Sequence, residues 1–158
     1  MHLPSLTTST TLFSLALAAA LPSHPKRAGG PIPVPIPSNC TLANPLPNAT
    51  NATNNNQISG YRPSTIFAAT HSIYSSYFDA FLNQSAEWQQ CLEQCYGYEG
   101  CKAAILAYEV AVPEGYYGGP GGELATACLM YDKFIETQDF VLAKEGRWVN
   151  ETAQNIVC

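Results

Sequence analysis

Few residues in this chain are able to do catalysis. Nucleophilic and metal-assisted reactions need a nucleophile with a base, or a set of metal ligands, and the sequence has neither a Gly-x-Ser-x-Gly nor a His-Glu-x-x-His pattern. After residue 27 one histidine remains, His71, which we expect at the surface. Asp132, Glu136 and Asp139 lie near one another in the sequence and are candidates for a glycosidase carboxylate pair, but solvated surface acids are the favoured interpretation. The sequence predicts no catalytic residue.

Contact through aromatic rings is the second chemistry available. Tyr116 and Tyr117 lie in the Gly-rich stretch 114–122, which no Lys-Ser or Lys-Thr follows and which is therefore not a phosphate-binding loop. Aromatic rings on loops stack on sugar rings or fill a pocket of a partner, and Trp148, beside Arg147, is a further candidate. The alternative, favoured for all three side chains, is that the tyrosines fold back on a sheet and that Trp148 packs in the core. If the chain binds a ligand, these are the expected contact residues.

The cysteines indicate an oxidising compartment. Their number is even, which in a secreted protein implies up to three disulfides, and the residues alone allow fifteen pairings. A zinc site would need close cysteine pairs or added histidines, whereas Cys128 and Cys158 stand alone, so we expect no metal and no cofactor. The six cysteines are Cys40, Cys91, Cys95, Cys101, Cys128 and Cys158.

The N-terminal residues predict export. Residues 10–20 form an apolar run that ends in small residues, which is typical of a signal peptide over 1–20 and too short to span a bilayer. Residues 21–27 end in Lys26-Arg27, which resembles a kexin-type propeptide site of the fungal secretory pathway. Cleavage there leaves five basic residues against twelve acidic ones. We expect a secreted, extracellular protein that does not insert into membranes.

Residues 28–60 are predicted to form an arm ahead of the folded part. Proline alternates with β-branched residues over 29–38, which excludes a helix and favours an extended, polyproline-like spacer over a recognition peptide. Residues 44–57 have almost no large apolar side chain and are expected to be a mobile, glycosylated loop. The N-glycosylation acceptors, here and further along the chain, are Asn39, Asn48, Asn51, Asn83 and Asn150.

Residues 61–158 are expected to fold as an α+β domain. Apolar residues at helical spacing predict one helix, capped by Ser85 and stopped by Gly97, with Trp88 in the core. Cys91 and Cys95 share its buried face and are expected to bond to other elements rather than to each other. Short apolar segments predict strands at 102–112, 124–135, 139–143, 147–149 and 156–158, with one or two more within 72–82.

The stretch Cys91-Leu-Glu-Gln-Cys95-Tyr-Gly-Tyr-Glu-Gly-Cys101, followed by an apolar strand and Cys128-Leu-Met-Tyr-Asp-Lys, resembles the core of a PAN/apple domain. The similarity covers about residues 70–158. It implies one helix packed on a curved antiparallel sheet and disulfide pairs Cys91–Cys128 and Cys95–Cys101. It also implies that Cys40 and Cys158 join the ends of the domain.

Composition excludes one class of partner. Only 12% of the residues are charged, the formal charge is −5, and no block of Lys or Arg offers a footprint for nucleic acid. The resemblance implies an adhesion unit. We therefore expect a non-catalytic binding module whose partner is a cell-wall or host-surface glycan or an extracellular protein. The alternatives are an effector or structural surface protein with a single protein partner and, less favoured, a small carboxylate-dependent hydrolase.

Overall fold

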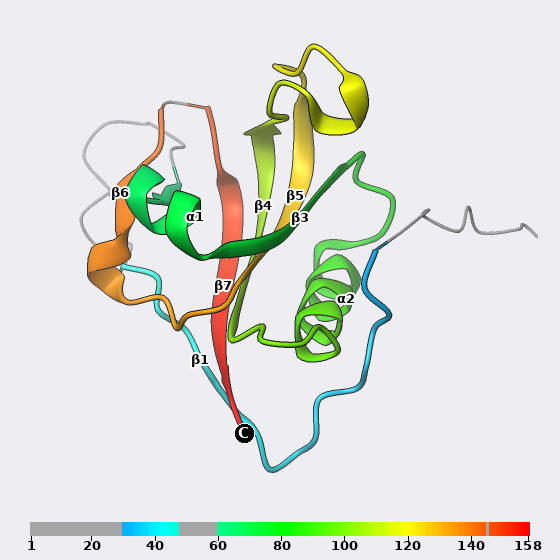
Figure 1. Cartoon of the computed structure of the whole chain (residues 1–158), viewed down its shortest axis with the longest axis vertical. Coiled ribbons are helices and arrows are strands. Elements are labelled where there is room, and N and C mark those ends of the chain that lie inside the picture. The colour runs from blue at the N-terminus through cyan, green and yellow to red at the C-terminus, as the bar shows by residue number, and fades with distance from the viewer. Residues whose placement is uncertain (1–29, 48–59, 145) are drawn as a thin grey trace, which may run out of the picture.

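A computed structural model describes residues 30–47, 60–144 and 146–158 of the chain (Figure 1). The predicted signal peptide (1–20), the predicted propeptide site at Lys26-Arg27 and the acceptors Asn48 and Asn51 lie outside the described residues. The α+β class is confirmed, with two helices and an antiparallel sheet.

The central sheet has five strands in the order β1-β7-β4-β5-β3, and every neighbouring pair is antiparallel. In chain order these strands are β1 (Thr41–Ala43), β3 (Ser72–Phe78), β4 (Ala103–Ala111), β5 (Leu124–Tyr131) and β7 (Val149–Val157). A second sheet pairs β2 (Tyr61–Pro63) with β6 (Phe140–Leu142). Bulges interrupt the pairings of β3 with β5 and of β4 with both of its neighbours, and bulges of this kind bend and twist a sheet.

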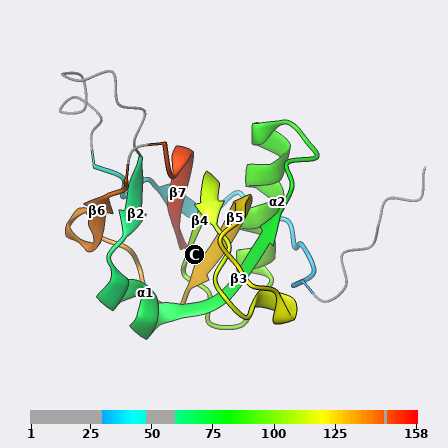
Figure 2. The same ribbon diagram turned by 90° about the horizontal axis from the view of Figure 1, so that it is seen from above.

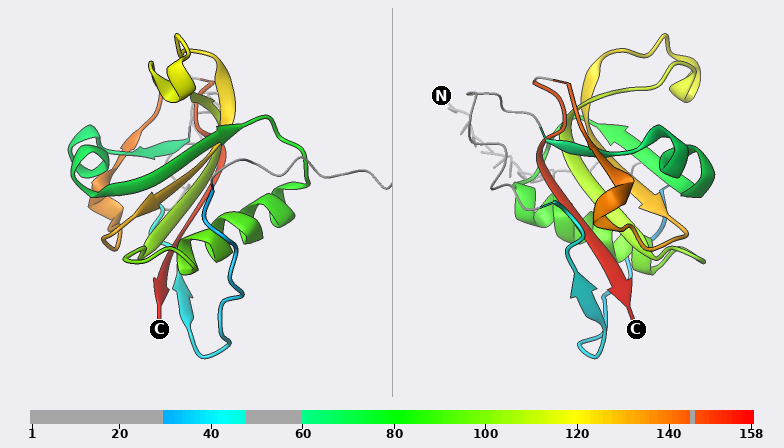
Figure 3. Two further views of the ribbon diagram at one scale, coloured as in Figure 1. Left: turned by 45° about the vertical axis from the view of Figure 1, so that its right-hand side comes forward. Right: turned by 90° about the vertical axis from the view of Figure 1, so that its left-hand side faces the viewer.

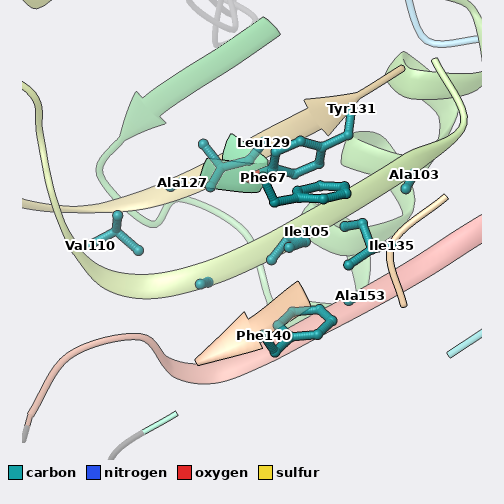
Figure 4. Close-up of a cluster of buried hydrophobic side chains, with 11 residues drawn as sticks. Phe67, Ala103, Ile105, Val110, Ala127, Leu129, Tyr131, Ile135, Phe140 and Ala153 are labelled. Atoms are coloured by element: carbon teal, nitrogen blue, oxygen red, sulfur yellow. The ribbon is translucent and has the colours of Figure 1, made fainter. Parts of the chain in front are cut away.

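The sheet lies between two covering layers (Figures 2 and 3). Helix α2 (Gln84–Tyr96) covers one face, while α1 (Thr65–His71) and the β2–β6 sheet lie on the other. Strand side chains alternate between the faces, so on the central strand β4 Ile105 belongs to the cluster under α1 and β6, whereas Leu106 packs under α2. Figure 4 shows the first cluster, in which Phe67 and Tyr131 lie together. Burial on both faces explains the continuous apolar run over residues 103–107 of β4.

Helix α2 begins one residue after Asn83, so the prediction of Ser85 as its cap is wrong. The Asn83 Oδ1 atom accepts a hydrogen bond from the Ala86 backbone N–H at 3.0 Å, which satisfies one of the free donors of the first turn. Ser85 lies inside that turn. Both residue types cap helices well, and the sequence alone did not decide between them.

Helix α1 is the main element that the sequence did not predict, and the expectation of one helix is corrected to two. Ser64 caps it, with Oγ accepting from the Phe67 N–H at 3.2 Å. Phe67 is its one buried residue, and the ring lies 5.4 Å from that of Tyr131. A helix of two turns with one buried side chain shows no apolar periodicity, which is the signal on which helix prediction depends.

Strands β1 and β2 were not predicted, and the other strands differ from prediction mainly at their ends. Strand β5 ends at Tyr131 rather than at residue 135. Directly after Tyr131, the Asp132 N–H donates a hydrogen bond to the His71 carbonyl. Strand β7 (Val149–Val157) replaces the two strands expected at 147–149 and 156–158: Arg147 and Trp148 precede it, and it runs on from Val149 to Val157 without a break. Its middle is polar in sequence, but Ala153 there is buried opposite Ile105 of β4, so pairing continues through it.

The described part of the predicted arm packs on the folded body. Residues 30–38 have no regular structure, as expected for an extended segment, and run beside α2 (Figure 1). The Val34 N–H donates to the Glu93 carbonyl at 3.0 Å, and a Cβ at Gly97 would come within 2.6 Å of the Ile32 carbonyl oxygen. Strand β1 then joins the sheet beside β7.

Three disulfides tie these parts together, and they join the pairs that the PAN/apple resemblance implies. Cys91–Cys128 fixes α2 to β5, Cys95–Cys101 closes the turn after α2, and Cys40–Cys158 joins the start of β1 to the end of β7. The helix is therefore held at two points by sulfur, and both chain ends of the sheet are tied.

Candidate functional site

The Gly-rich loop between β4 and β5 places its two tyrosines differently. Tyr116 folds back on the edge strand β3, where its hydroxyl accepts a hydrogen bond from the Tyr77 N–H at 3.1 Å. The two rings meet edge to face with centroids 4.9 Å apart. Tyr117 follows on the short 3-10 turn η2 (Tyr116–Gly118) and is 82% exposed. The fold-back alternative therefore holds for Tyr116, and Tyr117 faces solvent.

The loop has a defined shape despite its glycines. The Gly115 N–H donates to the Gly119 carbonyl at 2.9 Å, and the Val112 N–H donates to the Glu123 carbonyl at the base of the loop at 2.9 Å. At Gly121, with φ +70°, a Cβ would lie 2.6 Å from the Glu114 nitrogen, so glycine is required there. Tyr117 itself has φ 48°, a left-handed conformation that is costly for a residue with a side chain. Such strain in a loop is a feature often associated with function.

The tyrosines line a pocket of about 370 Å³ beside β3, which is an edge strand among the described strands. Tyr74, Ser76 and Tyr77 come from β3, and Gln94 comes from α2. The volume lies in the range of small-molecule sites, about 300–1,000 Å³. Its described lining consists of Gly30, Tyr74, Ser76, Tyr77, Gln94, Tyr116 and Tyr117.

This tyrosine pocket, as the seven residues are called below, has no charged side chain among its described lining. Burial raises the pKa of Tyr77, a hydrogen bond with Ser75 opposes that shift, and Tyr116 adds to it. The Tyr77 phenol therefore stays neutral at physiological pH. The described lining has four phenol rings, the Ser76 hydroxyl and the Gln94 amide, which suits an uncharged polar ligand.

Sequence reasoning named Tyr116 and Tyr117 and missed the rest of the lining. Tyr74 and Tyr77 belong to the segment 72–82, for which the sequence predicted one or two strands but not the strand with which they pair. Only the antiparallel pairing of β3 with β5 shows that β3 is an edge strand among the described strands. Gln94 is buried on α2 and has no sequence signal that would single it out.

Trp148 does not join these tyrosines. It is half-buried against the cluster under β6, and it lines a separate pocket with Arg62, Lys144 and Arg147. Its carbonyl oxygen lies so close to Gly60 that a Cβ there would overlap it, at 1.7 Å. The predicted contact residues therefore fall into two places, and the core-packing alternative holds for Trp148 in part.

The carboxylates considered for hydrolysis have separate local partners. Asp132 pairs with His71, with 2.9 Å between Oδ1 and Nδ1. Glu136 and Asp139 together cap the 3-10 turn η3 (Thr137–Asp139), and the Glu136 N–H donates to Asp139 Oδ2 at 2.9 Å. His71 is partly exposed, and its ring contacts Phe67. Among the described residues no cluster of His, Cys, Asp or Glu suited to a metal ion is found.

The acceptors Asn39, Asn83 and Asn150 are exposed and accessible to a glycan. Asn83 and Asn150 lie near each other, since Gln84 Nε2 donates to the Asn150 carbonyl at 3.0 Å.

None of the helices in the described ranges has the length and apolar character needed to span a membrane.

No family model, curated protein or solved structure matches this chain.

Proposed function

We propose that this protein is a secreted, non-catalytic binding module and that the tyrosine pocket holds a neutral carbohydrate. The observation that carries this proposal is the convergence of Tyr74, Tyr77, Tyr116 and Tyr117 on one pocket without a charged side chain in its described lining. Sugar rings present apolar C–H faces that pack on aromatic rings, and their hydroxyls need hydrogen-bond partners. Ser76 and Gln94 provide such partners.

Tyr117 is the residue best placed to contact a polymeric ligand. It is exposed and held in a strained conformation by a hydrogen-bonded loop, so little freedom is lost when it binds. Tyr116 supports it from below, with ring centroids 4.5 Å apart. An extended glycan chain along the β3 edge would contact both.

The disulfide framework supports an extracellular setting and a PAN/apple-like scaffold. Three disulfides among six cysteines are typical of oxidising compartments. A helix bearing Cys91 and Cys95 on an antiparallel sheet agrees with what the resemblance implies. An insoluble cell-wall or host-surface glycan is the partner that we favour for such a module.

An extracellular protein is the second candidate partner. Apolar side chains are exposed on several elements, among them Ile66 (82%), Leu142 (58%) and Phe81 (53%). Single exposed apolar residues are common, so this observation ranks below the tyrosine pocket.

Retention of the deglycosylated protein on insoluble chitin, β-glucan and cellulose tests the proposal. We expect retention on at least one of them, with loss in Tyr117→Ala. Phe134→Ala is the matched control, because Phe134 is an exposed aromatic residue outside the pocket lining. Absence of retention on every glycan, with a mixed glycan array also negative, would contradict carbohydrate binding and favour the protein partner.

A further inference from the structure

A second pocket, of about 350 Å³, gathers positive charge in an acidic protein. It lies beside the β2–β6 sheet and is lined by Arg62, Ala111, Leu142, Lys144, Arg147 and Trp148. Only five basic residues follow Arg27 in the chain, and three of them line this pocket. The other two are Lys102 and Lys133.

The fold brings these cations together from distant sequence positions. Arg62 lies on β2, opposite Val141 of β6, and Lys144 and Arg147 follow β6 directly. Gly60 holds the arrangement, because its N–H donates to the Arg147 carbonyl at 3.3 Å and its carbonyl accepts from Ala143 at 2.9 Å. The cationic pocket, as we call the six residues, is thus part of the pairing between the two short strands.

The three basic side chains have few partners within the described part of the chain. None of the three basic side chains forms an ion pair there, and no acidic residue belongs to the described lining. The Arg147 Nη1 atom is buried without a hydrogen-bond partner. Arg62 Nη1 donates to the Pro63 carbonyl and to Thr65 Oγ1, which leaves the other N–H groups of this guanidinium. The carboxylate of Glu151, which is not in the described lining, accepts a hydrogen bond from the Tyr61 backbone N–H through Oε1 at 2.9 Å.

We propose that the cationic pocket binds an acidic sugar, meaning a sugar-sized molecule that carries a carboxylate or phosphate group. Arg62 and Arg147 hold the oxyanion, since guanidinium groups match carboxylate and phosphate in a two-pronged geometry, and the Lys144 ammonium group adds a third positive charge. Trp148 offers an aromatic side chain to the rest of the ligand. The volume exceeds what a bare oxyanion needs and lies in the range for small ligands. No residue is shared with the lining of the tyrosine pocket.

Calorimetric titration of the intact protein with glucuronate, glucose 6-phosphate, glucose and inorganic phosphate tests this site. We expect binding of at least one acidic sugar and none of glucose, with affinity that falls as salt rises from about 0.01 to 0.15 M. The acidic sugar that binds identifies carboxylate or phosphate as the preferred group. Failure of both acidic sugars to bind would overturn the proposal. Inorganic phosphate binding as tightly as glucose 6-phosphate would overturn the assignment to a sugar.

Variants of single residues test whether the ligand binds in the cationic pocket. Lys144→Gln and Arg147→Gln should each weaken binding about tenfold or more, the effect of losing a charge-assisted hydrogen bond. Lys133→Gln removes the same charge from an exposed residue outside the pocket and should leave affinity unchanged. Lys144 is exposed, so its variant reports on binding even if Arg147→Gln disturbs folding. Equal losses in Lys144→Gln and Lys133→Gln would contradict the site, and unchanged affinity in Tyr117→Ala separates it from the tyrosine pocket.

Discussion

The hydroxyl oxygen of Tyr116 accepts a hydrogen bond from the backbone N–H of Tyr77, with 3.1 Å between the two atoms. Tyr77 belongs to the edge strand β3, so this bond attaches the Gly-rich loop to an edge of the central sheet. It gives the loop a fixed position and makes Tyr116 a supporting residue of the tyrosine pocket. Tyr117 is left exposed to solvent.

Tyr116→Phe should loosen this attachment. Loss of one hydrogen bond costs about 1 kcal/mol of unfolding free energy, and the Tyr77 amide should exchange its hydrogen faster because it loses its acceptor. Hydrogen exchange followed by NMR, with urea unfolding, measures both effects. Tyr117→Phe removes a hydroxyl from the exposed neighbour and is the matched control. Unchanged exchange at Tyr77 in Tyr116→Phe would show that the bond does not hold the loop.

Glu87 is a buried carboxylate that joins three segments. It is 2% exposed, and Oε1 accepts from the Phe81 and Leu82 N–H groups at 2.9 and 3.1 Å. Oε2 accepts from the Tyr108 hydroxyl at 2.7 Å. Glu87→Ala removes both acceptor oxygens and with them all three hydrogen bonds, and it should lower the unfolding free energy by about 2–4 kcal/mol.

Glu87→Gln provides the comparison for that prediction. The amide oxygen still accepts from the two backbone N–H groups, so urea unfolding should show a smaller loss than in Glu87→Ala. If the two variants are equally destabilised, the carboxylate charge rather than hydrogen bonding is the dominant contribution. If neither is destabilised, Glu87 does not join these segments.

The Cys40–Cys158 disulfide closes a loop with a sequence separation of 118 residues. In the chain-entropy model, closing a loop of this length contributes about 4–5 kcal/mol. Cys158→Ser combined with Cys40→Ser, which avoids a free thiol, should therefore lower the melting temperature strongly. Amide exchange should also rise in β1, which pairs only with β7 among the described strands. An unchanged melting curve would show that this bond contributes little.

Sequence reasoning succeeded where one side-chain pattern determines one element. The helical spacing of Cys91, Leu92 and Cys95 predicted α2, and the largely apolar segment 102–112 predicted the central strand β4. Helix α1 was not predicted, because Phe67 is its one buried residue and gives no apolar periodicity. The continuity of β7 depends on pairing across the sheet, where Ala153 lies opposite Ile105.

The candidate sites depend even more on tertiary pairing. Tyr116 and Tyr117 were named from their loop, but their partners Tyr74 and Tyr77 are defined by which of the described strands lies at an edge of the sheet. Arg62 and Arg147 meet through the β2–β6 pairing and the close approach of Gly60 to Trp148. No local pattern reports contacts between residues so far apart in the chain.

Buried tyrosines predict a loss of stability in alkali. Burial raises the pKa of the Tyr131 hydroxyl, and the nearby Tyr77 adds to the shift. Above the unfolded pKa of about 10, the unfolded chain loses this proton while the folded chain keeps it. The unfolded state then binds fewer protons, so stability is full below pH 10 and is lost as the pH rises toward the folded pKa.

For Tyr131 the predicted slope is about 1.4 kcal/mol per pH unit above pH 10. Urea unfolding between pH 8 and about 11, compared between the wild type and Tyr131→Phe, measures it. The variant should show a shallower decline, because it has no proton to lose at this position. Parallel curves for the two proteins would contradict the assignment of the effect to Tyr131.

The most direct test of the account is the retention of deglycosylated wild type, Tyr117→Ala and Phe134→Ala on insoluble chitin, β-glucan and cellulose, with melting temperature recorded alongside. Tyr117 is exposed and makes its ring contact with Tyr116, so its removal should spare the fold. The account predicts that the wild type and Phe134→Ala bind the same glycan and that Tyr117→Ala binds it at least about tenfold more weakly, a loss of about 1.4 kcal/mol, with an unchanged melting temperature. Retention by Tyr117→Ala equal to that of the wild type would contradict the tyrosine pocket as the carbohydrate site.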